Sequence, residues 1–205
     1  RLRKMRLLPT EYLYYYYRPE VALANLQKAG TSRGHAVAAL TDALFADLAQ
    51  GVADPIVRYR HYLAARDASY MQLESGTTTP RLKPDWAELS GYDKIALMTI
   101  SAIAGNTGAV MPLNVANRAI LPFLKDDDII ETPCVVDSDG PHPRAVAAVP
   151  EDARALISRV KEFERATVQA AVSGDRADAV EALALNPLVP SRPLAEQLVD
   201  ALLPR

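Results

Sequence analysis

The stretch "AVMPLNVANRAILPFLKDDDIIETPCVVDSDG", residues 109–140, contains two short segments that are rich in Val and Ile and are bounded by turn residues. Such segments are typical of β-strands, and they predict strands at 109–117 and 128–140. The stretch "PRAVAAVP", residues 143–150, is a candidate for a third strand. Strands and helices do not alternate along the chain as they do in a parallel sheet. We therefore expect a small, mainly antiparallel sheet in the middle of the chain.

Helical patterns fill most of the chain on both sides of these strands. Apolar side chains at Leu40, Leu44 and Leu48, for example, fall on one face of a helix. The segment at 92–105 is so apolar that we expect a central helix there, whereas the polar, proline-containing segment at 77–91 predicts a surface loop. The sequence therefore predicts an α+β fold that is mostly helical. The expected helices cover residues 9–18, 19–30, 32–51 with Thr31 as a cap, 54–76 with Asp54 as a cap, 92–105, 151–174, 176–187 and 192–203.

The composition is that of an ordinary globular protein. The 205 residues are 49% hydrophobic and 23% charged, which suits one domain or at most two small ones. With 23 basic and 25 acidic residues, the chain has no strong field that would attract nucleic acid or a membrane surface. No segment is long enough to span a bilayer. One cysteine excludes an internal disulfide framework and fits the reducing cytoplasm. Because the chain begins with Arg, we expect it to be a fragment of a longer protein.

The stretch "LPTEYLYYYYR", residues 8–18, places five tyrosines within six positions. Since successive helical residues turn by about 100°, Tyr12, Tyr15 and Tyr16 share one face, and Tyr14 and Tyr17 share roughly the opposite one. One interpretation is that the helix packs between two surfaces. The other is that one phenol acts as a base or a hydrogen-bond donor. A phenol has a pKa near ~10, so a base near neutral pH needs a metal ion or an arginine beside it.

Histidine and cysteine offer little for a metal site. His35, His61 and His142 do not have the spacing of metal-ligand pairs, and we expect His35 and His61 on the surface. Cys134 lies in an expected strand, where an inert core thiol is the better interpretation. We therefore expect no metal site within this chain.

Two asparagines follow the first expected strand. Asn114 and Asn117 can hold a turn at the end of the strand, or they can offer their amides to a sugar or a phosphate. The sequence has no glycine-rich phosphate-binding loop. We therefore expect no bound dinucleotide cofactor in this chain.

Three stretches, in this order along the chain, resemble the C-terminal half of glycoside hydrolase family 4, in particular its 6-phospho-β-glucosidase-like members. They are "LPTEYLYYYYR" at 8–18, the segment from Tyr92 to Val136, and "ALALNPLVPS" at 182–191. The resemblance spans nearly the whole chain. It implies that residues 1–205 form a C-terminal domain for the substrate side and oligomerisation, similar to that of lactate and malate dehydrogenases. An N-terminal NAD-binding Rossmann domain would lie outside this chain.

The resemblance also implies an activity. Enzymes of this family hydrolyse O-glycosidic bonds with NAD and a divalent metal, usually manganese, and they depart from the two-carboxylate scheme of most glycosidases. They oxidise C3 of the sugar, which acidifies the proton on C2. A tyrosine then removes that proton and the aglycone is eliminated. By its position in the motif Tyr12 is our first choice for that base, with Tyr15 and Tyr16 as alternatives.

The same resemblance gives expectations for cofactors and partners. NAD and Mn²⁺ would be bound mainly by the absent N-terminal domain, so the isolated chain should be inactive. The substrate would be a small sugar or sugar phosphate, and the enzyme would be a cytoplasmic homodimer or homotetramer that binds neither nucleic acid nor membranes.

Two departures from the family pattern stand beside this resemblance. Many relatives carry Arg-Gly-Gly before the central helix, where the resemblance implies a position near the sugar phosphate, whereas residues 87–94 read "AELSGYDK". Ala119 stands where the family has a glycine.

Two other classes of protein remain open from the residues alone. One is a non-catalytic helical interaction module. The other is the C-terminal domain of a 2-hydroxy-acid dehydrogenase, which would need a His and an Arg placed for a carboxylate.

Overall fold

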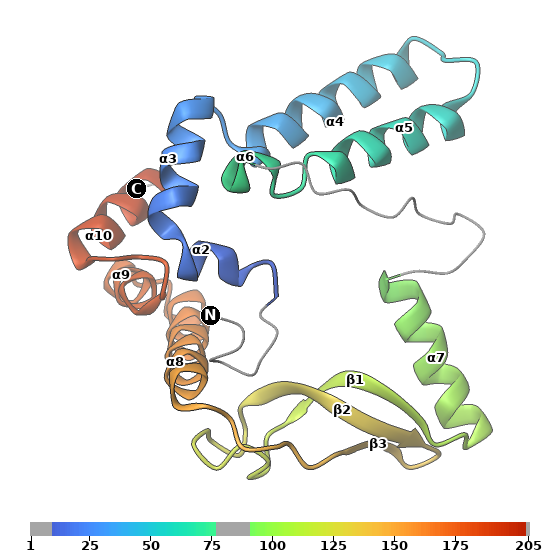
Figure 1. The fold of residues 1–205 in the computed structure, drawn as a ribbon, viewed down its shortest axis with the longest axis vertical. Coiled ribbons are helices and arrows are strands. Elements are labelled where there is room, and N and C mark those ends of the chain that lie inside the picture. Colours follow the sequence, from blue (N-terminus) through green and yellow to red (C-terminus); the bar gives the residue numbers. More distant parts are fainter. Residues whose placement is uncertain (1–9, 77–90, 204–205) are drawn as a thin grey trace. The chain divides into compact units, whose positions relative to one another are not determined.

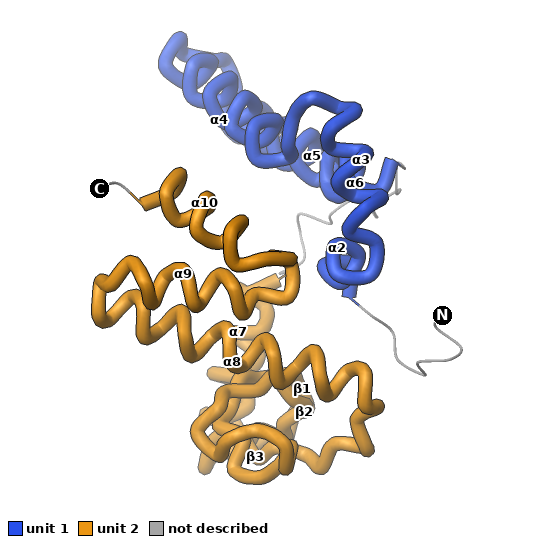
Figure 2. The backbone as a smooth tube through the Cα atoms, turned by 90° about the vertical axis from the view of Figure 1, so that its left-hand side faces the viewer, with its two compact units in different colours: residues 1–84 blue, residues 85–205 orange. Residues whose placement is uncertain are grey.

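The computed structural model describes residues 10–76 and 91–203, and the chain divides into two compact units (Figure 2). Unit 1 is Arg1–Pro84 and unit 2 is Asp85–Arg205. The surface loop expected at 77–91 and the Pro9 start of the first expected helix lie outside the described residues, apart from Gly91.

Unit 1 is helical, and its helix ends follow local signals in the sequence. Pro19 and Pro55 each open a helix, where a missing N–H costs nothing. Asp54 is the predicted cap, and its carboxylate accepts the N–H groups of Ile56 and Val57 at 3.0 Å. The described helices of unit 1 are α2 Leu13–Tyr17, α3 Pro19–Ala29, α4 Arg33–Ala49, α5 Pro55–Ala68 and α6 Gln72–Ser75, with α4 and α5 side by side (Figure 1).

Two expectations for unit 1 were wrong. Ser32, not Thr31, caps α4, because its hydroxyl accepts the N–H of His35 at 3.3 Å. The single helix expected over 54–76 is interrupted after Ala68. There the Ser69 hydroxyl donates to the carbonyl of Arg66 at 2.7 Å, a local bond that competes with the helix. Met71 then adopts a left-handed backbone with φ of 56°. This break places Tyr70 in a turn.

Unit 2 contains the sheet and the remaining helices. The strands pair antiparallel in the order β1-β2-β3, and Met111 of the first strand lies opposite Cys134 of the second. The α+β fold class, mostly helical with a small antiparallel sheet, is therefore confirmed. The elements are α7 Gly91–Gly105, β1 Ala109–Ala116, β2 Ile129–Asp137, β3 Gly140–Pro143, α8 Glu151–Ser173, α9 Arg176–Leu185 and α10 Arg192–Leu202.

The first two strands were predicted correctly, but the third was placed wrongly. β3 follows β2 through a two-residue turn, and residues 144–150 form no strand. The carboxylate of Asp137 accepts the N–H of Asp139 at 2.9 Å, and Gly140 has a φ of 108° that favours glycine. These local preferences close a hairpin earlier than the apolar pattern indicated. Two prolines suit β3, since it is at the edge of the sheet.

Helix α7 is less central than its composition predicted. It packs chiefly against β1 and β2 (Figure 1), and Ala102 is its one buried residue. Ile100 is 62% exposed and Tyr92 is 94% exposed. Because apolar residues surround this helix on all sides, a sheet on one side can cover only a few of them. Much of the helix therefore remains an apolar surface in the described part of unit 2.

Two small clusters form the buried interior of unit 2. The first joins α7 to the sheet, and the second joins α9 to α10. The first cluster is Ala102, Met111, Cys134 and Val136, and the second is Val180, Val189, Ala195 and Val199.

Within the described residues, no helix combines the length and the apolar character needed to cross a membrane.

Candidate functional site

The tyrosine-rich segment forms a turn followed by a short helix. The N–H of Leu13 donates to the carbonyl of Thr10 at 3.1 Å, and the N–H of Tyr14 donates to Glu11 at 3.0 Å. The helix ends at Arg18, because the residue before a proline avoids helical backbone. Tyr12 therefore lies in the turn that precedes α2, with 65% of its surface exposed.

The structure surrounds part of this segment with polar and charged side chains from elsewhere in unit 1. The Tyr12 and Tyr70 rings meet edge to face, with centroids 6.2 Å apart. The Tyr70 hydroxyl donates to Glu11 Oε1 at 3.3 Å, and the Arg33 guanidinium lies 5.0 Å from the centre of the Tyr70 ring. Tyr15 bonds to the buried carboxylate of Glu74. We call this set the phenol cluster: Glu11, Tyr12, Tyr15, Arg33, Tyr70 and Glu74.

The three candidate tyrosines have different surroundings. Tyr12 and Tyr15 both belong to the phenol cluster. Tyr12 is exposed, whereas Tyr15 is half-buried. Tyr16, which is 37% exposed, instead packs edge to face on Tyr17 with ring centroids 5.1 Å apart. The ring contact of Tyr16 is thus with a residue of its own helix, whereas Tyr12 and Tyr15 contact groups that the fold brings in from Tyr70 and Glu74.

The surroundings of Tyr15 disfavour its ionisation. Burial first, and then the hydrogen bond and negative charge of Glu74, raise the pKa of Tyr15 to about 12, while the charge of Arg33 opposes the rise. A phenol with so high a pKa carries very little phenolate at neutral pH. Tyr15 is therefore poorly suited to act as a base in this environment, and it is better suited to hold Glu74.

Four members of the phenol cluster were not identified from the sequence. Arg33, Tyr70 and Glu74 are distant from Tyr12 along the chain, and no local pattern pointed to them. Glu11 is adjacent to Tyr12, so its proximity was available as a signal. Arg33 brings an arginine to the cluster, where its guanidinium lies on the Tyr70 ring and its charge acts on Tyr15. Its Nε atom is buried without a hydrogen-bond partner in the described part of the chain, while one of its terminal nitrogens donates to the Arg66 carbonyl at 3.5 Å.

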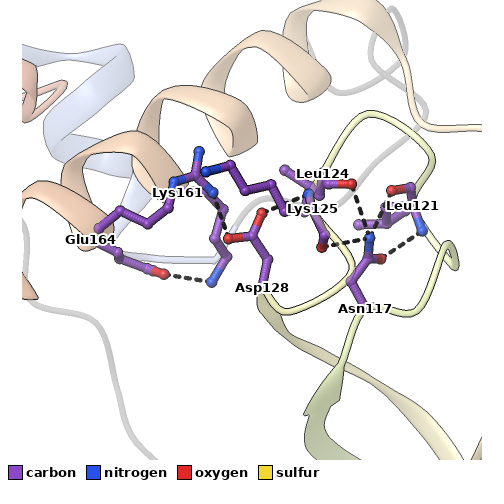
Figure 3. Close-up of polar contacts among 8 residues, drawn as sticks. Asn117, Leu121, Leu124, Lys125, Asp128, Lys161 and Glu164 are labelled. Carbon is purple, nitrogen blue, oxygen red and sulfur yellow. Dashed lines mark hydrogen bonds and ion pairs between the residues drawn. The ribbon is translucent and has the colours of Figure 1, made fainter.

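Asn117, the second asparagine candidate, lies in unit 2 and holds a loop together (Figure 3). Its side chain is fully buried, and its amide NH₂ donates to the carbonyls of Leu121, Leu124 and Lys125 at 2.9 to 3.3 Å. Its carbonyl accepts the N–H of Leu121 at 2.8 Å. Both amide hydrogens are thus engaged, which favours the turn-holding interpretation over a sugar contact.

Asn114 has a different position. It lies exposed on β1, opposite Glu131 of β2. A contact between Asn114 and a sugar therefore remains a prediction.

Asp128 closes the same loop by an ion pair with α8. Its carboxylate accepts the N–H of Lys125 at 2.9 Å and the Arg165 guanidinium at 2.5 Å. Burial would raise the pKa of Asp128, but the bonds from Arg165 and Lys125 and the charges of Arg165 and Lys161 hold it below its ordinary value. The ionised form therefore stabilises the folded state.

This lowered pKa predicts a loss of stability in acid. A carboxyl whose pKa is lower in the folded state stabilises the fold above its unfolded pKa of about 4, and the effect is lost as the pH falls through the folded value. The free energies of unfolding of the wild type and of Asp128→Asn, measured in urea, should differ most near pH 7 and converge as the pH falls below the folded pKa of Asp128. Asp127→Asn, at an exposed neighbour, is the control. A difference that is independent of pH would contradict the assignment.

Ala119, where the family has a glycine, has a left-handed backbone with φ of 65°. Such a conformation costs a residue with a Cβ roughly 1–2 kcal/mol, and glycine avoids most of this cost. Ala119→Gly should therefore raise the free energy of unfolding by about 1 kcal/mol. Thermal or urea unfolding measures the change. Ala166→Gly, in the regular helix α8, should lower it by about 1 kcal/mol. A loss of stability in both variants would refute strain at Ala119.

His35, His61 and Cys134 lie as expected, and His142 lies on β3. His35 and His61 are exposed, and His142 bonds to the Asp137 carboxylate at 2.9 Å on the surface. Cys134 is fully buried in the core, which raises the pKa of its thiol. Within residues 10–76 and 91–203, no three His, Cys, Asp or Glu side chains come together as a metal site.

Comparisons with known proteins agree with the motif assignment. The family model described as "Family 4 glycosyl hydrolase C-terminal domain" matches residues 1–189. A probable 6-phospho-beta-glucosidase of Bacillus subtilis is 37% identical over 125 residues, which is 60% of this chain and 28% of that protein. The 6-phospho-beta-glucosidase of Escherichia coli is 28% identical over 200 residues, 96% of this chain and 39% of that protein.

Solved structures have the same fold. The 6-phospho-beta-glucosidase from Thermotoga maritima with NAD and glucose-6-phosphate has a TM-score of 0.68 at 23% identity, over 97% of this chain and 42% of that one. A 6-phospho-alpha-glucosidase from gut microorganisms in complex with NAD and Mn²⁺ gives a TM-score of 0.53 at 22% identity, over 70% and 30% of the two chains. The chain spans less than half the length of these relatives.

Proposed function

The chain belongs to family 4 of the glycosyl hydrolases, as their C-terminal domain, and on that premise we propose that it is the substrate-side part of an NAD- and divalent-metal-dependent glycosidase. The family match over residues 1–189 carries this proposal. The relatives named above are 6-phospho-glucosidases, and they favour an O-glycoside of a sugar phosphate as the substrate.

The step that we assign to this chain is removal of the sugar C2 proton by Tyr12. Its exposed side chain can meet a sugar, unlike a phenol sealed in a core. The Tyr12 ring packs on Tyr70, and the Arg33 guanidinium lies 5.0 Å from the centre of the Tyr70 ring, so the cluster that contains Tyr12 also contains a positive charge. The high pKa of Tyr15 and the separate packing of Tyr16 support Tyr12 over these alternatives.

The cofactors are assigned to polypeptide outside this chain. The described residues offer no cluster of metal ligands, and the sequence has no glycine-rich phosphate loop. NAD would supply the oxidation and later reduction at C3 when bound. We therefore assign no step of the reaction to a metal or nicotinamide contact by these residues, and we expect the isolated 205 residues to be inactive.

The residues that would recognise a phosphate group on the sugar differ from the family pattern. The family's Arg-Gly-Gly is replaced here, and residues 87–90 of that stretch lie outside the described residues. We propose a phosphorylated glucoside as the substrate, because the relatives that we compared bear that specificity in their names. Another group must then take the place of the family's arginine.

We also propose that the enzyme is a cytoplasmic homodimer or homotetramer. The exposed apolar side chains of α7, among them Leu97, Ile100 and Ile103, would suit a covered surface. Light scattering of the full-length protein should give the mass of a dimer or larger. A clean monomer at high concentration would refute this assembly.

The function is tested with the full-length gene product, NAD, Mn²⁺ and a panel of aryl glycosides with and without a 6-phosphate. We expect hydrolysis of 6-phospho-glucosides that depends on both cofactors. Release of the aryl group measures it. Hydrolysis of unphosphorylated glycosides alone would overturn the substrate assignment, and no hydrolysis under any of these conditions would overturn the function.

A further inference from the structure

The proposed function leaves Tyr70 without a role, although Tyr70 contacts both the assigned base Tyr12 and the carboxylate of Glu11. Its ring meets the Tyr12 ring edge to face, with centroids 6.2 Å apart. Its hydroxyl donates to Glu11 Oε1 at 3.3 Å, across 59 residues of sequence. Glu11 is exposed, whereas Tyr70 is half-buried. The fold thus places a phenol between the assigned base and a carboxylate that reaches water.

From this geometry we propose that Tyr70 and Glu11 form a proton relay between the hydroxyl of Tyr12 and solvent. The proposal rests on the proposed function, in which Tyr12 is the base. A sugar bound against Tyr12 would displace the water that now reaches its exposed side chain. A second route would then be needed for proton exchange, and Tyr70 and Glu11 supply it.

The relay is balanced in protons and moves no electrons between groups. Tyr12, as phenolate, takes the C2 proton, and the electron pair of the C–H bond stays with the sugar. The new O–H bond of Tyr12 breaks as its proton joins the Tyr70 oxygen. The original Tyr70 proton passes to the Glu11 carboxylate, which releases it to water. Water is the sole further reactant.

The surroundings of Tyr70 suit a relay. Burial raises the pKa of Tyr70, and its hydrogen bonds to Tyr12 and Glu11 and the charges of both raise it further. Tyr70 is therefore protonated, and it gives up its own proton only as it takes the proton of Tyr12. The Arg33 guanidinium lies against its ring and opposes a net negative charge in the cluster. The separation of 3.3 Å between Tyr70 and Glu11 exceeds the typical value of about 2.8 Å. Transfer therefore requires a contraction of about 0.5 Å when substrate binds.

Exchange at C2 in D₂O tests the relay in the full-length enzyme with NAD, Mn²⁺ and an unlabelled 6-phospho-glucoside. Mass spectrometry measures the fraction of sugar product that carries deuterium at C2. In the wild type most of the product should be deuterated. In Tyr70→Phe and Glu11→Gln, protium at C2 should be retained several-fold more often, because the proton on Tyr12 cannot leave before it returns to the sugar.

The isotope ratio separates a relay from a structural role. A merely structural role for Tyr70 would lower turnover but leave the ratio of deuterium to protium unchanged, and that result would overturn the relay. Tyr59→Phe, which alters an exposed tyrosine stacked on Tyr62 of α5, should keep the wild-type ratio. A wild type that hydrolyses the substrate with no deuterium at C2 would instead overturn Tyr12 as the base.

A second measurement covers the case that Tyr70→Phe fails to fold. Glu11→Gln alters an exposed side chain and preserves its size, so the ratio can still be read in that variant. Absorbance at 295 nm follows tyrosine ionisation with pH. Glu11→Gln should lower the pH at which Tyr70 ionises, since the Glu11 charge and bond raise the pKa of Tyr70. An unchanged titration together with an unchanged isotope ratio would overturn the relay.

Discussion

Tyr12→Phe in the full-length enzyme should lower kcat by about 10²- to 10⁴-fold, the usual contribution of a general base. The substitution removes the hydroxyl and keeps the ring that packs edge to face on Tyr70. We therefore expect the fold and NAD binding to stay unchanged. Steady-state release of an aryl group measures the loss, and protein fluorescence titrated with NAD measures cofactor binding.

Matched tyrosines make this result specific. Tyr15→Phe should reduce turnover far less, because the pKa of Tyr15, raised to about 12, leaves it mostly protonated at neutral pH. Tyr59→Phe should have no effect on turnover. If Tyr15→Phe or Tyr16→Phe abolished turnover while Tyr12→Phe did not, the assignment of the base would move to that residue.

Asn117→Ala should lower the free energy of unfolding by at least about 4 kcal/mol. It removes the amide that bonds three backbone carbonyls and one N–H of the 117–128 loop, at about 1 kcal/mol for each net hydrogen bond. Buried carbonyls left without partners add to the loss. Urea or thermal unfolding of the full-length protein measures the change.

Asn114→Ala is the control for that measurement. Asn114 is exposed on β1, and a surface substitution usually changes stability by less than about 0.5 kcal/mol. If Asn117→Ala were equally mild but weakened substrate binding, the loop-holding role would be wrong and the sugar-contact interpretation would return.

Local rules accounted for most helices and for two of the three strands. Asp54 caps α5 and proline opens α3 and α5, because these residues act through their nearest backbone neighbours. The failures also have local causes. The Ser69 hydroxyl and the left-handed Met71 interrupted a continuous helical pattern. The turn after Asp137 reverses the chain, so that β3 is Gly140–Pro143 and not the more apolar segment 143–150 that we had expected.

The candidate site was predictable only in part. The motif at 8–18 directed attention to Tyr12, and the family assignment made from three stretches was confirmed. Sequence periodicity placed Tyr12, Tyr15 and Tyr16 on one face, but it could not show that Glu74 raises the pKa of Tyr15 or that Tyr16 packs on Tyr17. Those effects depend on which distant side chains the fold brings near.

The sequence by itself determined the family, the α+β class and the tyrosine motif, since each depends on residue type and spacing along the chain. Only the tertiary structure brought Arg33, Tyr70 and Glu74 close to that motif. It also directed the side-chain amide of Asn117 toward the carbonyls of the 117–128 loop. The physical reason is that hydrogen bonds, ring contacts and charge effects act over a few ångströms of space. Their partners can be 59 residues apart in the chain, as Glu11 and Tyr70 are.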